Sequence, residues 1–205
     1  GAWLILHKKK SLKESIKFIF NPKVFFSKSA TSDYKVFFIN QIIMLLISPH
    51  LLTQITIATA LYFFFFEINF IDMGLFATAP KYLIISLFTL THFVVDDFSK
   101  YIVHRWMHRW PFLWALHKVH HSATNLTPMT VFRTHPLEGL VFTLRSAFAQ
   151  GLTISTFVYL FGGGVDLYTV LGANLFVFLF NVFGSNLRHS HIGIRYWKWL
   201  EYILI

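Results

Sequence analysis

Residues 97–138 read DFSKYIVHRWMHRWPFLWALHKVHHSATNLTPMTVFRTHPLE, and they hold six of the chain's eleven histidines. Five of the six form two motifs, HRWMH at 104–108 and HKVHH at 117–121. Helical residues three or four positions apart share a face, so the first motif presents two imidazoles to one point and the second presents three. Pro111 lies between the motifs and can end the first helix. The spacing therefore predicts that the second motif turns back toward the first.

The chain around these motifs is unusually apolar. Of its 205 residues, 55% are hydrophobic, 19% are aromatic and only 13% are charged. This composition excludes a disordered chain and argues against an ordinary soluble domain. The sequence has no cysteine, which excludes disulfides, thiolate zinc sites, iron–sulfur clusters and cysteine nucleophiles within it. We therefore expect a bilayer to surround much of the chain.

Long uncharged runs predict the membrane spans. The run 36–66 has 31 residues, more than the ~20 that cross a hydrocarbon core. Pro49 interrupts this run, so we expect one long, tilted or kinked span, with a tight helical hairpin as the alternative. Further spans are expected at 82–103, 140–161 and 167–187, the last two forming an antiparallel pair around the glycines at 162–164.

Positive charge indicates which side of the membrane each segment occupies. The segments before 36, from 96 to 138 and after 187 hold 16 of the 18 lysines and arginines. With four spans these segments share one side, and the positive-inside rule makes that side cytoplasmic. The net charge of +9 then reflects topology, and no nucleic-acid partner is expected. The predicted fold class is an all-α integral membrane protein with about four transmembrane helices and a histidine-rich helical cap on the cytoplasmic side.

The histidines are expected at the membrane surface. His104 lies 23 residues beyond Lys81, which is roughly 34 Å of helix and just exceeds a hydrocarbon core of about 30 Å. His189 lies 22 residues beyond Leu167, at a similar depth. Five of the six tryptophans flank these histidines, as in an interfacial aromatic belt. In the basic segment ahead of the spans, Ser11 and Glu14 have capping-box spacing, which predicts an interfacial helix.

Clustered imidazoles at this spacing are typical of a metal site. Neutral imidazole binds Fe, Zn, Cu or Ni, and seven candidate ligands are too many for one ion with an open position. Two metal ions are therefore expected. Ligand type alone does not choose between redox-active iron and zinc. The alternative is that these histidines only contact lipid headgroups.

The two motifs and their D-F-x-x-Y-x-x-H-R frame resemble the first histidine boxes of the fatty acid hydroxylase superfamily. Within the superfamily they resemble the sterol desaturase and C-4 methylsterol oxidase group, and most closely its bacterial members. The resemblance covers about Lys81 to the C-terminus. It implies a membrane-bound non-haem diiron enzyme that uses O2 to hydroxylate or desaturate a fatty acyl chain or sterol. We accordingly divide the chain into a basic interfacial segment (1–35), a first span with an external loop (36–80) and a hydroxylase-like domain (81–205).

The resemblance carries metal-ligand roles to particular positions. Matching ligands are His104, His108, His117, His120 and His121, and His189 matches a further family histidine. His191 and His135 are weaker candidates, because His191 diverges from His189 on a helix and Pro136 makes His135 a loop position. The family has another HxxHH box downstream of the point where this sequence ends. We therefore expect a chain truncated before the last histidine box and inactive by itself.

Three charged residues, Asp96, Asp97 and Arg145, are also considered for the site. Asp97 shares a helical stripe with Tyr101, His104 and His108, so it is expected either to hold the ligands in place or to pair with a nearby cation. Arg145 is expected to snorkel to the surface or to pair with Asp97. Asp96 is expected to be structural.

The first functional hypothesis is a lipid hydroxylase or desaturase in lipid biosynthesis. It would use two Fe ions, with zinc as a substitute in isolated protein, and O2 as co-substrate. The sequence has no nucleotide fingerprint or haem-attachment motif. The electrons are therefore expected from a separate reductase, cytochrome or ferredoxin. The expected location is the bacterial inner membrane, or the endoplasmic reticulum in a eukaryote. The alternatives are a histidine-rich metal-ion transporter or sensor, or a catalytically inactive relative.

Overall fold

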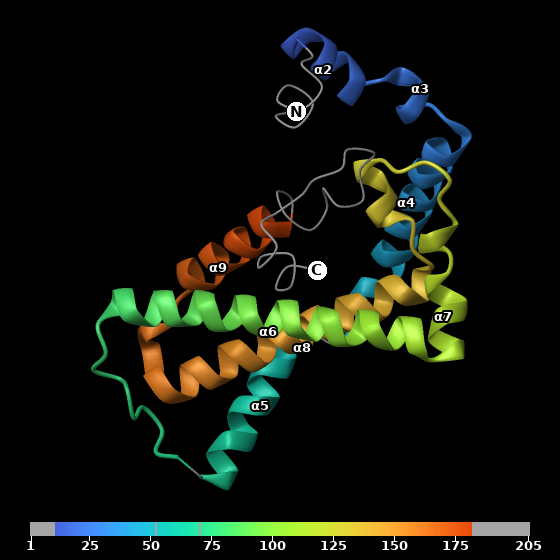
Figure 1. The fold of residues 1–205 in the computed structure, drawn as a ribbon. Coiled ribbons are helices and arrows are strands. Elements are labelled where there is room, and N and C mark those ends of the chain that lie inside the picture. The colour runs from blue at the N-terminus through green and yellow to red at the C-terminus, as the bar shows by residue number, and fades with distance from the viewer. Residues whose placement is uncertain (1–10, 52, 70, 182–205) are drawn as a thin grey trace.

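The computed structural model describes residues 11–181 except 52 and 70, and every regular element in this part is helical (Figure 1). Helices α4 (Lys28–Ile47) and α6 (Lys81–Arg109) are long and apolar enough to cross a membrane. The other main helices are α5 (Gln54–Ile68), α8 (Pro136–Phe161) and α9 (Leu167–Phe180). The all-helical prediction is confirmed for the described residues, while four membrane spans stay a prediction.

Shorter elements connect these helices. They are α2 (Leu12–Ile19), α3 (Pro22–Phe25), η1 (Ser48–His50), α7 (Pro111–His117), η2 (His120–Ser122), η3 (Pro128–Phe132) and η4 (Gly162–Gly164). The predicted capping box is present at the start of α2, where Ser11 Oγ accepts from Glu14 N at 3.3 Å and Glu14 Oε2 accepts from Ser11 N at 3.0 Å. Whether this helix lies on a membrane stays a prediction.

The single span predicted over 36–66 is two helices. Helix α4 begins earlier, after Ser27, whose Oγ accepts from Ala30 N at 3.1 Å. It ends at Ile47, because Pro49 has no N–H with which to continue the helical bonds. Thr53 then starts α5 by accepting from Thr56 N at 3.2 Å. A proline followed by a new N-cap thus separates the predicted span into two elements.

Helix α6 packs against α8 and α9, and this packing forms the apolar core. The core residues are Ile84, Phe88, Phe157, Phe161 and Ala173. The predicted glycine turn is present, with Gly162 at a φ of 60°. The predicted antiparallel pair of 140–161 and 167–187 is not, because α9 packs along α6 and not along α8. The prediction considered only the length of the linker and not the surface that α6 offers.

One ion pair joins the starts of α6 and α9. Lys81 Nζ donates to Asp166 Oδ2 at 2.7 Å, and Asp166 also caps α9 by accepting from Thr169 N at 2.8 Å. The hydrogen bond from Lys81, followed by the bonds from Thr169, lowers the pKa of Asp166 below its usual range. This contact fixes the end of α6 that is remote from the histidines.

Helix α4 is tied to the loop between η2 and α8 by a buried ion pair. Asp33 is fully buried and pairs with Arg133 Nε, and its Oδ2 accepts from Thr130 Oγ1 at 2.8 Å. Arg133 Nη2 also donates to the carbonyl of Ser29 at 2.6 Å. Residues about one hundred positions apart therefore hold the loop that follows the HKVHH motif.

Removing the charge of Asp33 is expected to destabilise the protein. Asp33→Asn leaves the buried Arg133 without its counter-charge, so the free energy of unfolding should fall by about 3–5 kcal/mol. Equilibrium unfolding in mixed detergent micelles measures this change. Asp72→Asn is the matched control because Asp72 is exposed. Equal stabilities of the two variants would contradict a structural role for the buried pair.

Helices α5 and α8 approach closely at Gly151. A Cβ atom built on Gly151 would lie 2.8 Å from Ile57 Cγ2, 2.9 Å from Ile57 Cβ and 3.0 Å from the carbonyl oxygen of Gln54. The last two atoms belong to a branch point and to the backbone, so they cannot move aside cheaply. A residue without a side chain is therefore required for this packing.

Gly151→Ala is expected to weaken the packing of α5 on α8. Because the added methyl group overpacks the contact, unfolding should become easier by about 1–3 kcal/mol. In α9, a methyl group added to Gly172 would meet no atom within 4 Å. Gly172→Ala should therefore leave stability unchanged or raise it by up to about 1 kcal/mol through helix propensity. The same unfolding measurement distinguishes the variants, and a stable Gly151→Ala protein would contradict the close approach.

Candidate metal centre

Two histidines lie in the last turns of α6. His104 and His108 are four residues apart, and their Nε2 atoms are separated by 3.1 Å. Helix α6 ends at Arg109, and α7 begins at Pro111, which occupies the first turn. The predicted turn at Pro111 is confirmed, and it directs the chain back past the end of α6.

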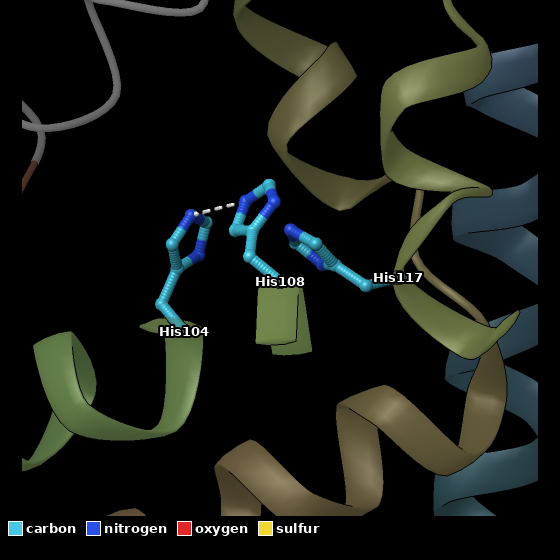
Figure 2. A group of neighbouring side chains, drawn as sticks. All are labelled: His104, His108 and His117. Atoms are coloured by element: carbon cyan, nitrogen blue, oxygen red, sulfur yellow. Dashed lines mark hydrogen bonds between the residues drawn. The ribbon is translucent and has the colours of Figure 1, made fainter. Parts of the chain in front are cut away.

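His117, the last residue of α7, faces this pair. Its ring centroid lies 4.8 Å from that of His104 and 4.8 Å from that of His108. The three residues can each offer a ligand atom, and these atoms lie within 4.8 Å of one another. Figure 2 shows the three imidazoles converging from α6 and α7. His117 is buried, whereas His104 and His108 are exposed.

The HKVHH motif is not one continuous helix, contrary to the expectation from spacing. Helix α7 ends at His117, and His120 and His121 lie in the 3₁₀ turn η2. His121 Nε2 nevertheless lies 3.2 Å from His117 Nε2, and the ring of His120 stacks at 5.4 Å from that of His117. The structure therefore brings together five of the six histidines that match ligands, and their role as ligands stays a prediction.

The nitrogen separations suit metal binding. Two imidazole nitrogens that bind one ion at about 2.0–2.1 Å, with about 90–110° between the bonds, lie about 2.8–3.4 Å apart. The separations of 3.1 Å in the HRWMH motif and 3.2 Å in the HKVHH motif fall within that range. Each motif thus supplies one pair of neutral nitrogen donors, which suits iron, zinc and other first-row metals.

A buried carboxylate orients one of these imidazoles. Glu138 Oε1 lies 2.7 Å from His117 Nδ1, and both side chains are 2% exposed. With an ionised carboxylate and a neutral ring, Nδ1 donates this hydrogen bond and Nε2 keeps its lone pair. The sequence interpretation did not select Glu138, although it lies three residues after His135 in the first turn of α8. Its place in the first turn of an expected helix, three residues after His135, was the signal that could have found it.

The fatty acid hydroxylase family model matches residues 89–205, more than half of the chain. The chain belongs to the fatty acid hydroxylase family. The histidine cluster lies within the matched residues, whereas α4 and α5 precede them. No solved structure matches the chain.

Sterol-modifying enzymes are among the curated relatives of this hydroxylase-family chain. It is 36% identical over 73 residues to a Delta(7)-sterol 5(6)-desaturase of Eremothecium gossypii, covering 35% of the chain and 20% of that protein. It is 42% identical over 60 residues to the Delta(7)-sterol 5(6)-desaturase of Saccharomyces cerevisiae, covering 29% and 16%. A Dictyostelium discoideum protein named as a methylsterol monooxygenase is 29% identical over 133 residues, covering 62% and 45%. The chain thus spans less than half of each of these relatives.

The charged residue that joins α6 to α8 in this family member is Asp96 and not Asp97. Arg145 Nη1 donates to Asp96 Oδ1 and to Ser99 Oγ, each at 2.8 Å, and Lys100 Nζ lies 3.5 Å from Asp96 Oδ2. The alternative in which Arg145 pairs with Asp97 is therefore wrong. Asp97 is half-buried and has no side-chain hydrogen bond or ion pair within residues 11–181. One helical position decides which of the two carboxylates faces α8.

His135 starts α8 as its N-cap. Its Nδ1 atom accepts a hydrogen bond from Leu137 N at 3.2 Å. This contact agrees with the expectation that His135 precedes a helix as a loop position, and it supplies no evidence for metal binding. His189 and His191 lie outside the described residues.

The role of His135 can be separated from metal binding by two substitutions. His135→Ala removes the cap and should cost about 1 kcal/mol of stability, whereas His135→Asn replaces it with a strong N-cap residue and should cost little. Metal content, measured by elemental analysis of the purified protein, should be unchanged in both variants. Loss of metal in His135→Asn would show that the imidazole is a ligand.

Proposed function

We propose that this protein is an integral membrane oxidoreductase that hydroxylates or desaturates a lipid, either a fatty acyl chain or a sterol. The observation that carries the proposal is the cluster of five imidazoles at the end of a membrane-length helix, in a chain of the fatty acid hydroxylase family. The names of the sterol-modifying relatives support a lipid substrate.

The metal that we propose is a pair of iron ions. His104 and His108 would hold one ion and His117 and His121 another, with His120 and His189 as further ligands. Bound iron would supply the reduction of O2 and the oxidation of an unactivated C–H bond, which zinc cannot do because it has no redox chemistry. Zinc could occupy the same nitrogens in isolated protein without giving activity.

The residues of the chain would set the position of the substrate. Helix α6 reaches the cluster from within the apolar part of the protein, so a lipid chain would meet the metals at the membrane surface. The indole of Trp114 lies 5.5 Å from the rings of His108 and His121 and covers one side of the cluster. The distance from the reactive centre to each C–H bond would then decide between adding a hydroxyl group and removing a second hydrogen.

Electron supply and location belong to the same proposal. The electrons would come from a reductase, cytochrome or ferredoxin at the cytoplasmic face, where the positive-inside rule puts the histidine motifs. The membrane would be the bacterial inner membrane or the endoplasmic reticulum. The division of the chain into segments 1–35, 36–80 and 81–205 also stays a proposal. The first and last of these segments are in contact, because Asp33 pairs with Arg133.

The experiment is to measure metal content and O2 uptake together on the full-length protein in lipid nanodiscs. We expect two irons per chain and O2 uptake that depends on an added lipid and an electron donor. His120→Ala should abolish both iron binding and product, because it removes a ligand that we propose. His135→Asn is the matched control and should keep both.

Three outcomes would contradict the proposal. Turnover retained in His120→Ala would remove the assigned role of the cluster. Metal transport into vesicles without O2 uptake would favour the transporter, and bound metal with neither transport nor O2 uptake would favour a sensor or an inactive relative.

A further inference from the structure

His117 uses its two ring nitrogens for different contacts. On one side, Nδ1 lies 2.7 Å from Glu138 Oε1. On the other side, Nε2 lies 3.2 Å from His121 Nε2 and faces the remaining imidazoles. The carboxylate is therefore on the side of the ring that points away from the other candidate ligands. Glu138 contacts a ligand and is not itself among the clustered ligand atoms.

The backbone puts this carboxylate where its charge is favoured. Glu138 is in the first turn of α8, after the N-cap His135 and Pro136. The helix dipole stabilises a negative charge in this first turn. A glutamate here is thus preorganised to face α7 with its carboxylate.

Burial makes the contact costly unless a positive charge lies nearby. Glu138 is fully buried, and its Oε2 atom has no hydrogen-bond partner in the described part of the chain. Within that part, the side chain of Glu138 contacts no lysine or arginine and pairs only with His117. A buried carboxylate is tolerated when a cation or a metal balances it. A positive charge on the His117 ring would supply that balance, either from a proton or from a metal on Nε2.

We propose that Glu138 is a positioning residue that holds His117 in the tautomer and orientation required for metal binding through Nε2. This inference rests on the proposed metal centre. Without the acceptor on Nδ1, the hydrogen of the neutral ring is free to move to Nε2, where it blocks the lone pair. Carboxylate–histidine–metal contacts of this kind typically raise metal affinity by roughly 10–100-fold.

The competing explanation is a purely structural bond between α7 and α8. Substitutions at Glu138 distinguish the two, because Glu138→Gln keeps the size and an acceptor oxygen but loses the charge, and Glu138→Ala loses both. Asp96→Asn is the control, since Asp96 is a buried carboxylate that pairs with Arg145 and Lys100 and not with a histidine. It should lower stability without weakening metal binding.

The measurement is the affinity of the purified full-length protein in nanodiscs for Co²⁺, by competition with a chromophoric chelator, together with the visible absorption of the bound Co²⁺. We expect the affinity of Glu138→Ala to fall by roughly 10–100-fold, with a changed Co²⁺ spectrum. Glu138→Gln should lie between it and the unsubstituted protein. If Glu138→Ala does not fold, the Co²⁺ affinity and spectrum of Glu138→Gln alone test the positioning role.

The outcomes separate this inference from the proposed function. If the unsubstituted protein binds no Co²⁺, the metal centre itself is overturned. If it binds Co²⁺ and both Glu138 variants bind equally well with the same spectrum, only the positioning role is overturned. An equal loss of affinity in Asp96→Asn would also overturn it, since the effect would then follow from stability.

Discussion

Pro111 has no backbone N–H and cannot extend α6, so the chain reverses between Arg109 and the start of α7. This reversal brings the HKVHH motif against the HRWMH motif. A continuous helix would instead put His117 about 14 Å along the axis from His108, since each residue adds about 1.5 Å. The observed ring separation of 4.8 Å therefore depends on the break before Pro111, where the preceding Trp110 is extended. The other contacts of the site refine an arrangement that this turn creates.

Three buried polar contacts join the helices around the histidines. Asp33 with Arg133 joins α4 to the loop after η2, Glu138 with His117 joins α8 to α7, and Arg145 with Asp96 joins α8 to α6. Each contact involves groups whose burial is costly unless both partners are present, so alternative packings that separate them are disfavoured. Helix α4 precedes the residues that match the family, yet it supplies one of these partners. The environment of the histidines thus extends beyond the matched part of the chain.

Features that depend on neighbouring residues could be predicted from the sequence, whereas contacts between residues far apart in the chain could not. The shared face of His104 and His108, the turn at Pro111 and the capping box at Ser11 depend on neighbours within a few residues, and they were predicted. Asp96 and Asp97 differ by one position, about 100° around a helix, so choosing between them required knowing which face α8 covers. Glu138 and Asp33 were missed because their partners lie 21 and 100 residues away. Periodicity identifies residues that share a face, but it does not identify the element that packs on that face.

The geometry also explains why a site of this kind suits a membrane enzyme. Imidazoles are neutral ligands, so a cluster of them carries little charge into the membrane surface before a metal binds. His104 and His108 are exposed at the end of a membrane-length helix, whereas His117 is buried and bonded to Glu138. His117 is therefore held between Glu138 and the other imidazoles, whereas His104 and His108 are exposed. A rigid ligand next to an open position is the combination that a reacting metal requires, because the ion must keep its ligands while it exchanges the molecules on which it acts.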